Sequence, residues 1–217
     1  MMSPLLWDLG RALLRPVLRV RFRFTSAGAG AERIPPTGPV LIVCNHLSLW
    51  DPPLVGSAAK PRRVYFMAKS ELFRFAPFGR LIERVGAFPV ARGGVDRDAI
   101  RMAREILRRG DAMVMFPEGT RSLSGRLRPF FPGAGLMALE DGVVVIPAAV
   151  WGSHRRFGPA RVVFGEPVDL SDLTDGARSE RVRLATQRIA QAVADLVPAA
   201  GGPPQRVADG EPSLERY

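Results

Sequence analysis

Cysteine, histidine and lysine are scarce in this sequence. Its 217 residues include one cysteine, two histidines and, among 31 basic residues, only two lysines. A single cysteine, Cys44, excludes an internal disulfide, and its place in an apolar segment predicts a small core residue in a reducing compartment. One cysteine and two histidines are too few for the usual structural zinc sites, which take four such ligands. We therefore expect neither a disulfide-stabilised scaffold nor a metal site.

Long apolar runs are also missing. The longest stretch without a charged residue runs from Ile34 to Trp50, and it contains three prolines, an asparagine and a histidine. A bilayer-spanning helix needs about 20 mainly apolar residues, so we predict no transmembrane helix. With 217 residues, of which 47% are hydrophobic, the chain is long enough for one well-buried domain and short for two.

Acidic residues are outnumbered by basic ones, 21 to 31, which gives a net charge of +10. An excess of this size predicts an anionic partner: nucleic acid, an anionic membrane or a phosphorylated substrate. No basic segment interleaved with aromatic residues and no nucleic-acid-binding motif is present, so we expect no nucleic acid among the partners.

The N-terminal segment has the periodicity of an amphipathic helix over residues 4–20. Charges interrupt its apolar residues, so we do not expect a cleaved signal peptide. Pro16 is expected to kink or break the helix. A leucine-rich face opposite arginines is typical of a helix lying in a membrane interface, and an ordinary helix docked on its own domain is the alternative. The predicted apolar face comprises Leu5, Leu6, Leu9, Leu13, Val17 and Val20, and the opposite face Asp8, Arg11, Arg15 and Arg19.

Strand-like and helix-like segments alternate through the rest of the chain. This alternation predicts an α/β fold, with a mixed, largely parallel sheet flanked by helices. The expected strands are 40–44, 63–67, 86–91, 112–116, 143–150 and 161–165, and the expected helices are 53–59, 70–84, 96–109, 132–140 and 179–197.

Three regions are expected along the chain. Residues 1–26 form the predicted membrane-docking segment, and residues 27–197 form the folded domain. Residues 198–217 are rich in Pro, Gly and charge, a composition that predicts a disordered tail.

Polar side chains gather directly after two of the predicted strands. Residues 45–51 (NHLSLWD) follow the first strand, and residues 116–122 (FPEGTRS) follow the fourth. Strand ends are the usual place for sites in open α/β sheets. The first segment supplies a histidine and an aspartate, and the second supplies a glutamate, an arginine and hydroxyls, so together they suggest a base, its orienting partner and an anion cradle.

His46 and Asp51 are five residues apart, about 140° around a regular helix, so their contact requires a turn between them. The prolines at 52 and 53 make such a turn reasonable, with Asp51 as the cap of a helix that opens on a proline. Asp51 then holds the proton on one imidazole nitrogen and leaves the other free to accept one. The simpler alternative is a capping aspartate and a hydrogen-bonded histidine at a strand end.

These two segments resemble the NHxSxxD (HX4D) and FPEGTRS blocks of the glycerolipid acyltransferases, the 1-acylglycerol-3-phosphate O-acyltransferases and their relatives. Residues 86–92 (GAFPVAR) and 145–150 (VIPAAV) resemble two weaker blocks of that family in the expected order. The resemblance covers roughly residues 30–165. It implies an acyltransferase fold, and transfer of an acyl group from a thioester to a lipid hydroxyl with His46 as base and no protein nucleophile.

The resemblance also implies the residues that bind substrate. The family assigns the FPEGTRS block to acceptor binding, which places Glu118, Gly119, Thr120 and Arg121 at the acceptor. Arg92 is expected to be a second phosphate ligand, with a solvated arginine at a strand end as the alternative. Lys69 either binds substrate phosphate or caps a helix.

The expected function is acyl transfer to a lysophospholipid, most simply lysophosphatidate to phosphatidate. The expected partners are an anionic membrane surface, the lysophospholipid and an acyl thioester carried by coenzyme A or acyl carrier protein, with no cofactor. The expected location is peripheral, on the cytoplasmic face of the cell membrane. Two alternatives remain: acylation of another lipid hydroxyl, as in a glycolipid or amino-lipid, and a non-catalytic membrane lipid-binding protein.

Overall fold

The computed structural model describes residues 2–24, 28–60, 62–91 and 96–207. Within them the strands form one sheet in the order β3-β2-β4-β1-β5-β6. β1 to β5 pair in parallel and β6 is antiparallel to β5, which confirms the predicted mixed, largely parallel sheet. The strands are β1 (Val40–Cys44), β2 (Val64–Lys69), β3 (Ala87–Val90), β4 (Ala112–Met115), β5 (Val144–Trp151) and β6 (Arg161–Phe164).

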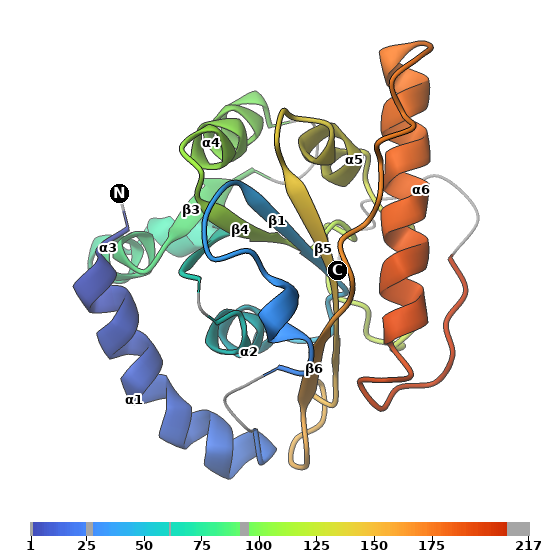
Figure 1. Ribbon diagram of the computed structural model, residues 1–217. Coiled ribbons are helices and arrows are strands. Elements are labelled where there is room, and N and C mark those ends of the chain that lie inside the picture. The colour runs from blue at the N-terminus through green and yellow to red at the C-terminus, as the bar shows by residue number, and fades with distance from the viewer. Residues whose placement is uncertain (1, 25–27, 61, 92–95, 208–217) are drawn as a thin grey trace.

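Helices cover both faces of this sheet (Figure 1). The central strand β1 is buried along its whole length, as expected for a strand with helices on both sides. Alternate β1 residues enter different cores: Ile42 packs in the cluster with α1 and α2, and Val43 in the cluster with α4, α5 and α6. The helices are α1 (Pro4–Phe22), α2 (Asp51–Ala58), α3 (Ala76–Arg84), α4 (Arg97–Arg108), α5 (Gly133–Ala138) and α6 (Arg178–Leu196), with short 3-10 turns η1 (Ala31–Arg33) and η2 (Ser70–Phe73).

Each predicted strand and helix is present, with boundaries within two residues, except for the helix expected over 70–84. That segment divides into η2 and α3 because Phe75 is extended, with φ −83° and ψ 99°. Pro77 explains the division. It has no N–H to donate to the carbonyl of Phe73, so a continuous helix would lose a bond at this point.

α1 has two apolar faces. On the inner face Trp7, Leu18 and Phe22 are at most 7% exposed, and the Trp7 ring stacks on Phe66 with centroids 6.0 Å apart. The helix continues through Pro16 without a break. The face predicted from leucine periodicity points outward, apart from half-buried Leu6, with Leu5 76%, Leu9 50%, Leu13 66%, Val17 45% and Val20 86% exposed. One face of α1 therefore docks on the domain, as in the second alternative, and the leucine face is exposed.

The arginines of α1 lie opposite the leucines, as predicted, but two of them are turned toward the domain. Arg11 and Arg15 are half-buried on the side toward the domain, and only Arg19 of the three is exposed. Asp8 lies among them, 3.6 Å from Arg11 and 2.6 Å from Arg63. The periodicity correctly separated charged from leucine-rich faces, but it did not reveal that the charged side meets the protein.

Residues 198–207 do not behave as the predicted tail. Ala200 is 2% exposed and packs with Val197, and Gln205 Oε1 accepts a hydrogen bond of 3.0 Å from the backbone N–H of Leu127. The composition is polar, but a few small apolar residues suffice to hold a short segment against an existing surface. Residues 208–217 lie outside the described part of the chain.

Candidate active site

The two polar segments meet because β1 and β4 are neighbours in the sheet. Val43 of β1 is paired with Met115 of β4, so the residues after these parallel strands leave the sheet at the same edge. The backbone N–H of His46 donates to Glu118 Oε1 at 2.6 Å, and the N–H of Ser122 donates to the His46 carbonyl at 2.7 Å. The structure thus brings together the segments that the sequence places about 70 residues apart.

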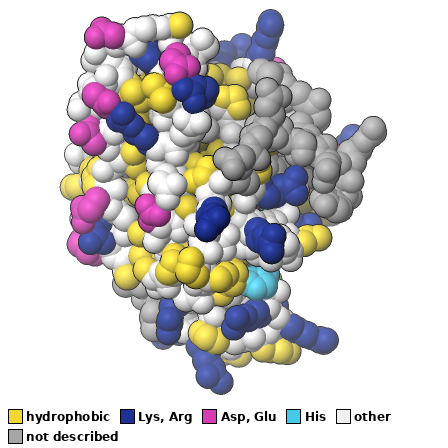
Figure 2. Space-filling view, turned by 90° about the vertical axis from the view of Figure 1, so that its right-hand side faces the viewer, with side chains coloured by type: hydrophobic (Ala, Val, Ile, Leu, Met, Phe, Trp, Pro, Cys, Tyr) yellow, Lys and Arg dark blue, Asp and Glu magenta, His cyan; other side chains and the backbone are white. Residues whose placement is uncertain are grey.

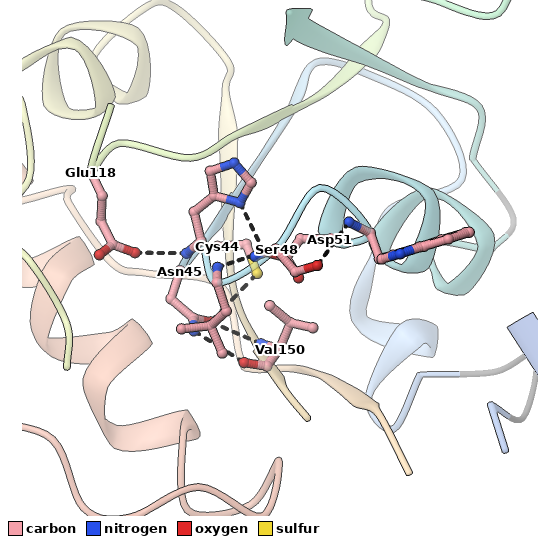
Figure 3. A network of polar contacts seen from close by, with 9 residues as sticks. Cys44, Asn45, Ser48, Asp51, Glu118 and Val150 are labelled. Atoms are coloured by element: carbon pink, nitrogen blue, oxygen red, sulfur yellow. Dashed lines mark hydrogen bonds and ion pairs between the residues drawn. The ribbon is translucent and has the colours of Figure 1, made fainter. Parts of the chain in front are cut away.

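Asp51 holds His46 and the loop around it. Its Oδ2 lies 2.8 Å from His46 Nδ1 and accepts from the backbone N–H groups of Leu47 at 2.6 Å and Ser48 at 2.7 Å. The predicted turn is present, with the Asp51 N–H donating to the Ser48 carbonyl at 3.1 Å. Figure 3 shows Asp51 and Ser48 within this network.

The position of Asp51 differs from the predicted cap. Asp51 is the first residue of α2, Trp50 occupies the cap position, and no side chain caps this helix. The Asp51 side chain is fully buried and turns back onto the preceding loop. It therefore fixes both the imidazole and the backbone of the loop, whereas a capping aspartate would bond the first turn of the helix.

His46 is left with one reactive nitrogen. Because Nδ1 faces the Asp51 carboxylate, it holds the proton, and Nε2 keeps its lone pair. The imidazole is 12% exposed and stacks on Phe116 with ring centroids 4.5 Å apart. An oriented, nearly buried imidazole with a free Nε2 has the arrangement of a general base.

Glu118 is buried and bonded to backbone groups on two segments. It is 1% exposed, and its second oxygen, Oε2, accepts from the backbone N–H of Arg128 at 2.9 Å. Burial raises the pKa of Glu118 from 4.5 to about 7. The two backbone N–H donors act in the opposite direction and lower this pKa, but burial has the larger effect. The carboxyl group therefore joins the His46 loop to the segment near Arg128.

Residues 119–121 follow the expected turn. Gly119 has φ +69°, a left-handed conformation that glycine adopts without strain. Thr120 is half-buried and Arg121 is exposed, and Arg121 has no ion-pair partner within the described residues. The bond from Ser122 to the His46 carbonyl holds this segment beside the histidine, so Arg121 is available to an anion near the site.

Asn45 has a role that the sequence reasoning missed. Its side chain is 3% exposed, and it donates to the Val150 carbonyl at 3.0 Å and accepts from the Val150 N–H at 2.8 Å (Figure 3). An amide matches both groups of one backbone residue, which a carboxylate does not. Asn45 thereby fixes the start of the His46 loop to β5. The sequence pattern that could have predicted this role is an Asn directly before the histidine, at the end of a buried strand.

Two further residues, Lys69 and Arg92, were predicted to bind substrate. Lys69 ends β2, which is separated from β1 by β4, and its Nζ lies 2.9 Å from Glu71 with the side chain 44% exposed. It does not cap η2. Arg92 lies outside the described residues.

The edge that carries the site is rich in basic and apolar groups. In Figure 2 the acidic side chains lie in the upper and middle parts of the face, among basic ones, while the lowest part shows basic and hydrophobic side chains and a histidine. The turn between β5 and β6 contributes His154, Arg155, Arg156 and Phe157, all exposed. Such an edge is suited to an anionic, amphipathic ligand.

Cys44 is a core residue, as predicted. It is 0% exposed, and burial first, followed by the charges of Asp51 and Glu118, raises its pKa well above the usual value. A buried thiol of this kind is a poor nucleophile. Among residues 2–24, 28–60, 62–91 and 96–207, no group of three or more His, Cys, Asp or Glu side chains is arranged to hold a metal ion.

Comparison with known families identifies the fold and the site together. A family model described as Acyltransferase matches residues 28–151, a range that includes both polar segments and five of the strands. The chain belongs to the acyltransferase family. The predicted resemblance is therefore confirmed.

Proteins similar to this chain in sequence are named as acyltransferases. The chain is 34% identical over 139 residues to a 1-acyl-sn-glycerol-3-phosphate acyltransferase of Streptococcus pneumoniae, covering 61% of this chain and 51% of the relative. It is 27% identical over 170 residues to one of Bacillus subtilis, covering 76% and 84%. It is 38% identical over 125 residues to a lyso-ornithine lipid O-acyltransferase of Pseudomonas aeruginosa, covering 57% and 46%. The chain thus spans about half the length of the first and third relatives.

A solved structure shares the fold of this acyltransferase. The crystal structure of the 1-acyl-sn-glycerophosphate acyltransferase of Thermotoga maritima matches with a TM-score of 0.65 and 27% identity, covering 88% of this chain and 78% of that one. The match extends beyond the family model, so most of the elements described above belong to the shared architecture.

Proposed function

We propose that this acyltransferase moves a fatty acyl group from a thioester to the free hydroxyl of a lysophospholipid, most simply converting 1-acylglycerol-3-phosphate to phosphatidate. The observation that carries the proposal is the His46–Asp51 pair, with Nδ1 held by the carboxylate at 2.8 Å and Nε2 left as acceptor. The names of the S. pneumoniae and B. subtilis relatives support the choice of acceptor.

The proposed reaction needs one base and no covalent intermediate on the protein. His46 Nε2 removes the proton from the acceptor hydroxyl as its oxygen attacks the thioester carbonyl. The resulting tetrahedral intermediate collapses, the C–S bond breaks, and the thiolate leaves and takes the proton from the imidazolium. Asp51 stabilises that imidazolium throughout. Base catalysis of this kind contributes roughly 10²- to 10⁴-fold in rate, and the thioester is a substrate, so no cofactor is required.

Arg121 is the proposed ligand of the acceptor phosphate. It is exposed, it lacks an ion-pair partner within the described residues, and its segment is bonded to the backbone of His46. A guanidinium matches a phosphate through paired, charge-assisted hydrogen bonds. Arg92 and Lys69 are proposed as further cations around the same substrate, with Lys69 released from Glu71 when an anion binds.

A second acceptor class is favoured by one observation. The P. aeruginosa relative, the one at 38% identity, is named for a lyso-ornithine lipid. Its acceptor is an amino-lipid, so the same base chemistry on a different head group is the competing proposal.

A lysolipid panel separates these proposals. Purified protein is offered lysophosphatidate, a neutral lysophospholipid and a lyso-ornithine lipid, each with acyl-coenzyme A and with acyl carrier protein thioester. Products are identified by mass spectrometry. We expect phosphatidate as the main product. Preferential acylation of lyso-ornithine lipid would select the alternative, and absence of acyl transfer to every acceptor would reject catalysis in favour of lipid binding.

We also propose that the enzyme is peripheral, on the cytoplasmic face of the cell membrane. Within the described residues, no helix has the length and apolar character needed to cross a bilayer. The exposed leucine face of α1 supports insertion into the head-group boundary of an anionic membrane. Docking in this way would bring the site to the surface where a lysophospholipid resides.

A further inference from the structure

α3 is an amphipathic helix whose apolar face is exposed, with no partner among the described residues. Phe75, Phe78 and Leu81 fall on one side of the segment and are 69%, 44% and 53% exposed. Only Gly79 of α3 is buried, where it lies against the backbone of Phe73. An amphipathic helix on a folded domain normally turns its apolar face to the core. In α3 that face is presented to the outside.

Exposed apolar side chains are concentrated in α3 and its neighbour α1. Thirteen large hydrophobic residues are exposed among the described residues; five lie on α1 and four in the segment 70–84, which contains η2, Phe75 and α3, so these two segments hold nine of the thirteen. α4 contributes only Met102. Scattered exposed hydrophobic residues are ordinary, whereas a concentrated set marks an interaction surface.

The two helices are adjacent, with α1 beginning beside the end of α3. The backbone N–H of Ser3, which precedes α1, donates to the carbonyl of Arg84, which ends α3, at 2.8 Å. Figure 1 shows α1 and α3 next to each other at the left edge, away from α6. Any flat apolar surface that meets the leucine face of α1 therefore lies close to α3.

The charges on η2 and α3 identify the kind of surface. Arg74, Arg80 and Arg84 are exposed, and none has an ion-pair partner within the described part of the chain. Arginines beside an apolar face complement anionic lipid head groups. A second copy of the chain, packed face to face, would instead bring these arginines toward their own equivalents, and like charges across an interface are unfavourable.

We propose that the apolar face of η2 and α3 (Leu72, Phe75, Phe78 and Leu81) is a second membrane-contacting element, which binds an anionic bilayer together with the leucine face of α1. The inference rests on the proposed function, in which the acceptor is a membrane lipid. Two contact elements determine the orientation of the domain, whereas one helix alone permits rotation about its axis.

Single-cysteine labelling tests this contact directly. Cys44 is 0% exposed and its thiol pKa is raised by burial, so an introduced surface cysteine is labelled selectively. The variants are Phe75→Cys and Phe78→Cys on α3, Leu9→Cys on α1, and Met102→Cys on α4 as control, 45% exposed against 44% for Phe78. Each carries a polarity-sensitive fluorophore and is titrated with vesicles of phosphatidylcholine, with and without phosphatidylglycerol.

We expect a blue shift at positions 75, 78 and 9 on anionic vesicles, and no shift at 102. In unlabelled protein, Phe78→Asp should lower the vesicle partition coefficient by about tenfold, from the lost burial of one aromatic side chain, while Met102→Asp should not. A shift at position 9 without one at 75 or 78 overturns the proposal. A shift at 75 and 78 that follows protein concentration without vesicles assigns the face to a second copy, which also overturns it.

The fluorescence readout is independent of turnover. Acyl transfer to lysophosphatidate is measured on unlabelled wild-type protein in parallel. A blue shift at 75 and 78 without transfer to any lysolipid would reject the proposed function and leave the membrane contact standing. Acyl transfer without a blue shift at 75 and 78 would support the proposed function and reject the membrane contact of α3.

Discussion

Single side chains at the carboxyl ends of β1 and β4 have distinct tasks. His46 presents a ring nitrogen, and Asp51 holds both the ring and the loop. Glu118 and Asn45 are buried, and they form hydrogen bonds with backbone groups of neighbouring segments. The site therefore depends on buried polar groups that hold its loops, because a loop leaving a buried strand must have its N–H and C=O groups satisfied.

His46→Ala should reduce kcat by at least about 10²-fold, the lower range for loss of a general base. Asp51→Asn should also be severely impaired, because an amide does not fix the imidazole tautomer in the same way. Steady-state kinetics measures both, with circular dichroism confirming the fold. His154→Ala, which removes the other histidine, is the matched control and should keep its rate. More than about a tenth of wild-type activity in either site variant contradicts the base assignment.

Arg121→Ala should chiefly raise the KM for lysophosphatidate, because a charge-assisted hydrogen bond contributes about 1.5 to 3 kcal/mol. This corresponds to roughly 10- to 150-fold in affinity. Arg126→Ala, an exposed arginine of the same loop, is the control. An acceptor without a phosphate near its hydroxyl should be affected little by Arg121→Ala. An equal effect on both acceptors would assign Arg121 to another task.

Glu118 should make stability depend on pH near neutrality. Its pKa is raised from 4.5 to about 7 by burial, so the folded protein holds this proton more tightly than the unfolded chain does. The contribution to stability is complete below the unfolded pKa and is lost as pH rises through the folded pKa. The pKa difference corresponds to about 3 kcal/mol of unfolding free energy.

Urea unfolding between about pH 5 and 8 measures this contribution. Glu118→Gln should remove the decline in unfolding free energy across that range, whereas Glu105→Gln, at an exposed glutamate, should keep it. Parallel pH profiles for wild type and Glu118→Gln would mean that another group titrates.

At the scale of elements, α1 combines two functions in one helix. Leu18 is 0% exposed, while Leu13 is 66% exposed on the other side. Deleting the whole segment would therefore remove part of the core together with the outward face, and a loss of membrane binding would have two explanations. Single substitutions separate the two faces.

Leu9→Ser with Leu13→Ser should weaken binding to anionic vesicles and change the unfolding free energy by no more than about 0.5 kcal/mol, as is usual at exposed positions. Leu18→Ala should instead lower stability by about 2 to 5 kcal/mol. Vesicle co-sedimentation and urea unfolding measure the two effects. Binding should also weaken as salt screens the arginine contribution. Unchanged co-sedimentation of the double variant would exclude the leucine face of α1 as the docking surface.

Sequence patterns predicted the elements well because each depends on local spacing. β1 was placed to the residue, and the break before α3 was missed because Pro77 was included in a helical pattern. Contacts between residues far apart in the sequence could not be predicted from local spacing. No periodicity reveals that Arg11 faces the domain, since that depends on where α2 and residue 63 lie in space. The bond from His46 to Glu118 likewise follows from the pairing of β1 with β4, which spacing alone does not specify.

At the scale of the whole molecule, the proposed reaction relies on neither a metal nor an acylated side chain. Activity should therefore survive EDTA, and mass spectrometry of the protein after incubation with acyl-coenzyme A alone should find no acyl adduct. Loss of turnover on chelation that added Mg²⁺ or Zn²⁺ restores would overturn the metal-free scheme. A stable adduct on Ser48 would replace direct transfer by a two-step route.

The strand order has a consequence for how the chain is made. β1 is synthesised first, yet its partners β4 and β5 begin at residues 112 and 144. The central strand therefore lacks its first partner until roughly 70 further residues have left the ribosome and its second until about 100 have. The outward leucines of α1 emerge before any of the sheet exists. Long-range parallel pairing is slow and leaves apolar segments open to aggregation. A nascent chain that meets a membrane early would shelter those leucines, so lipid contact can precede folding as well as follow it.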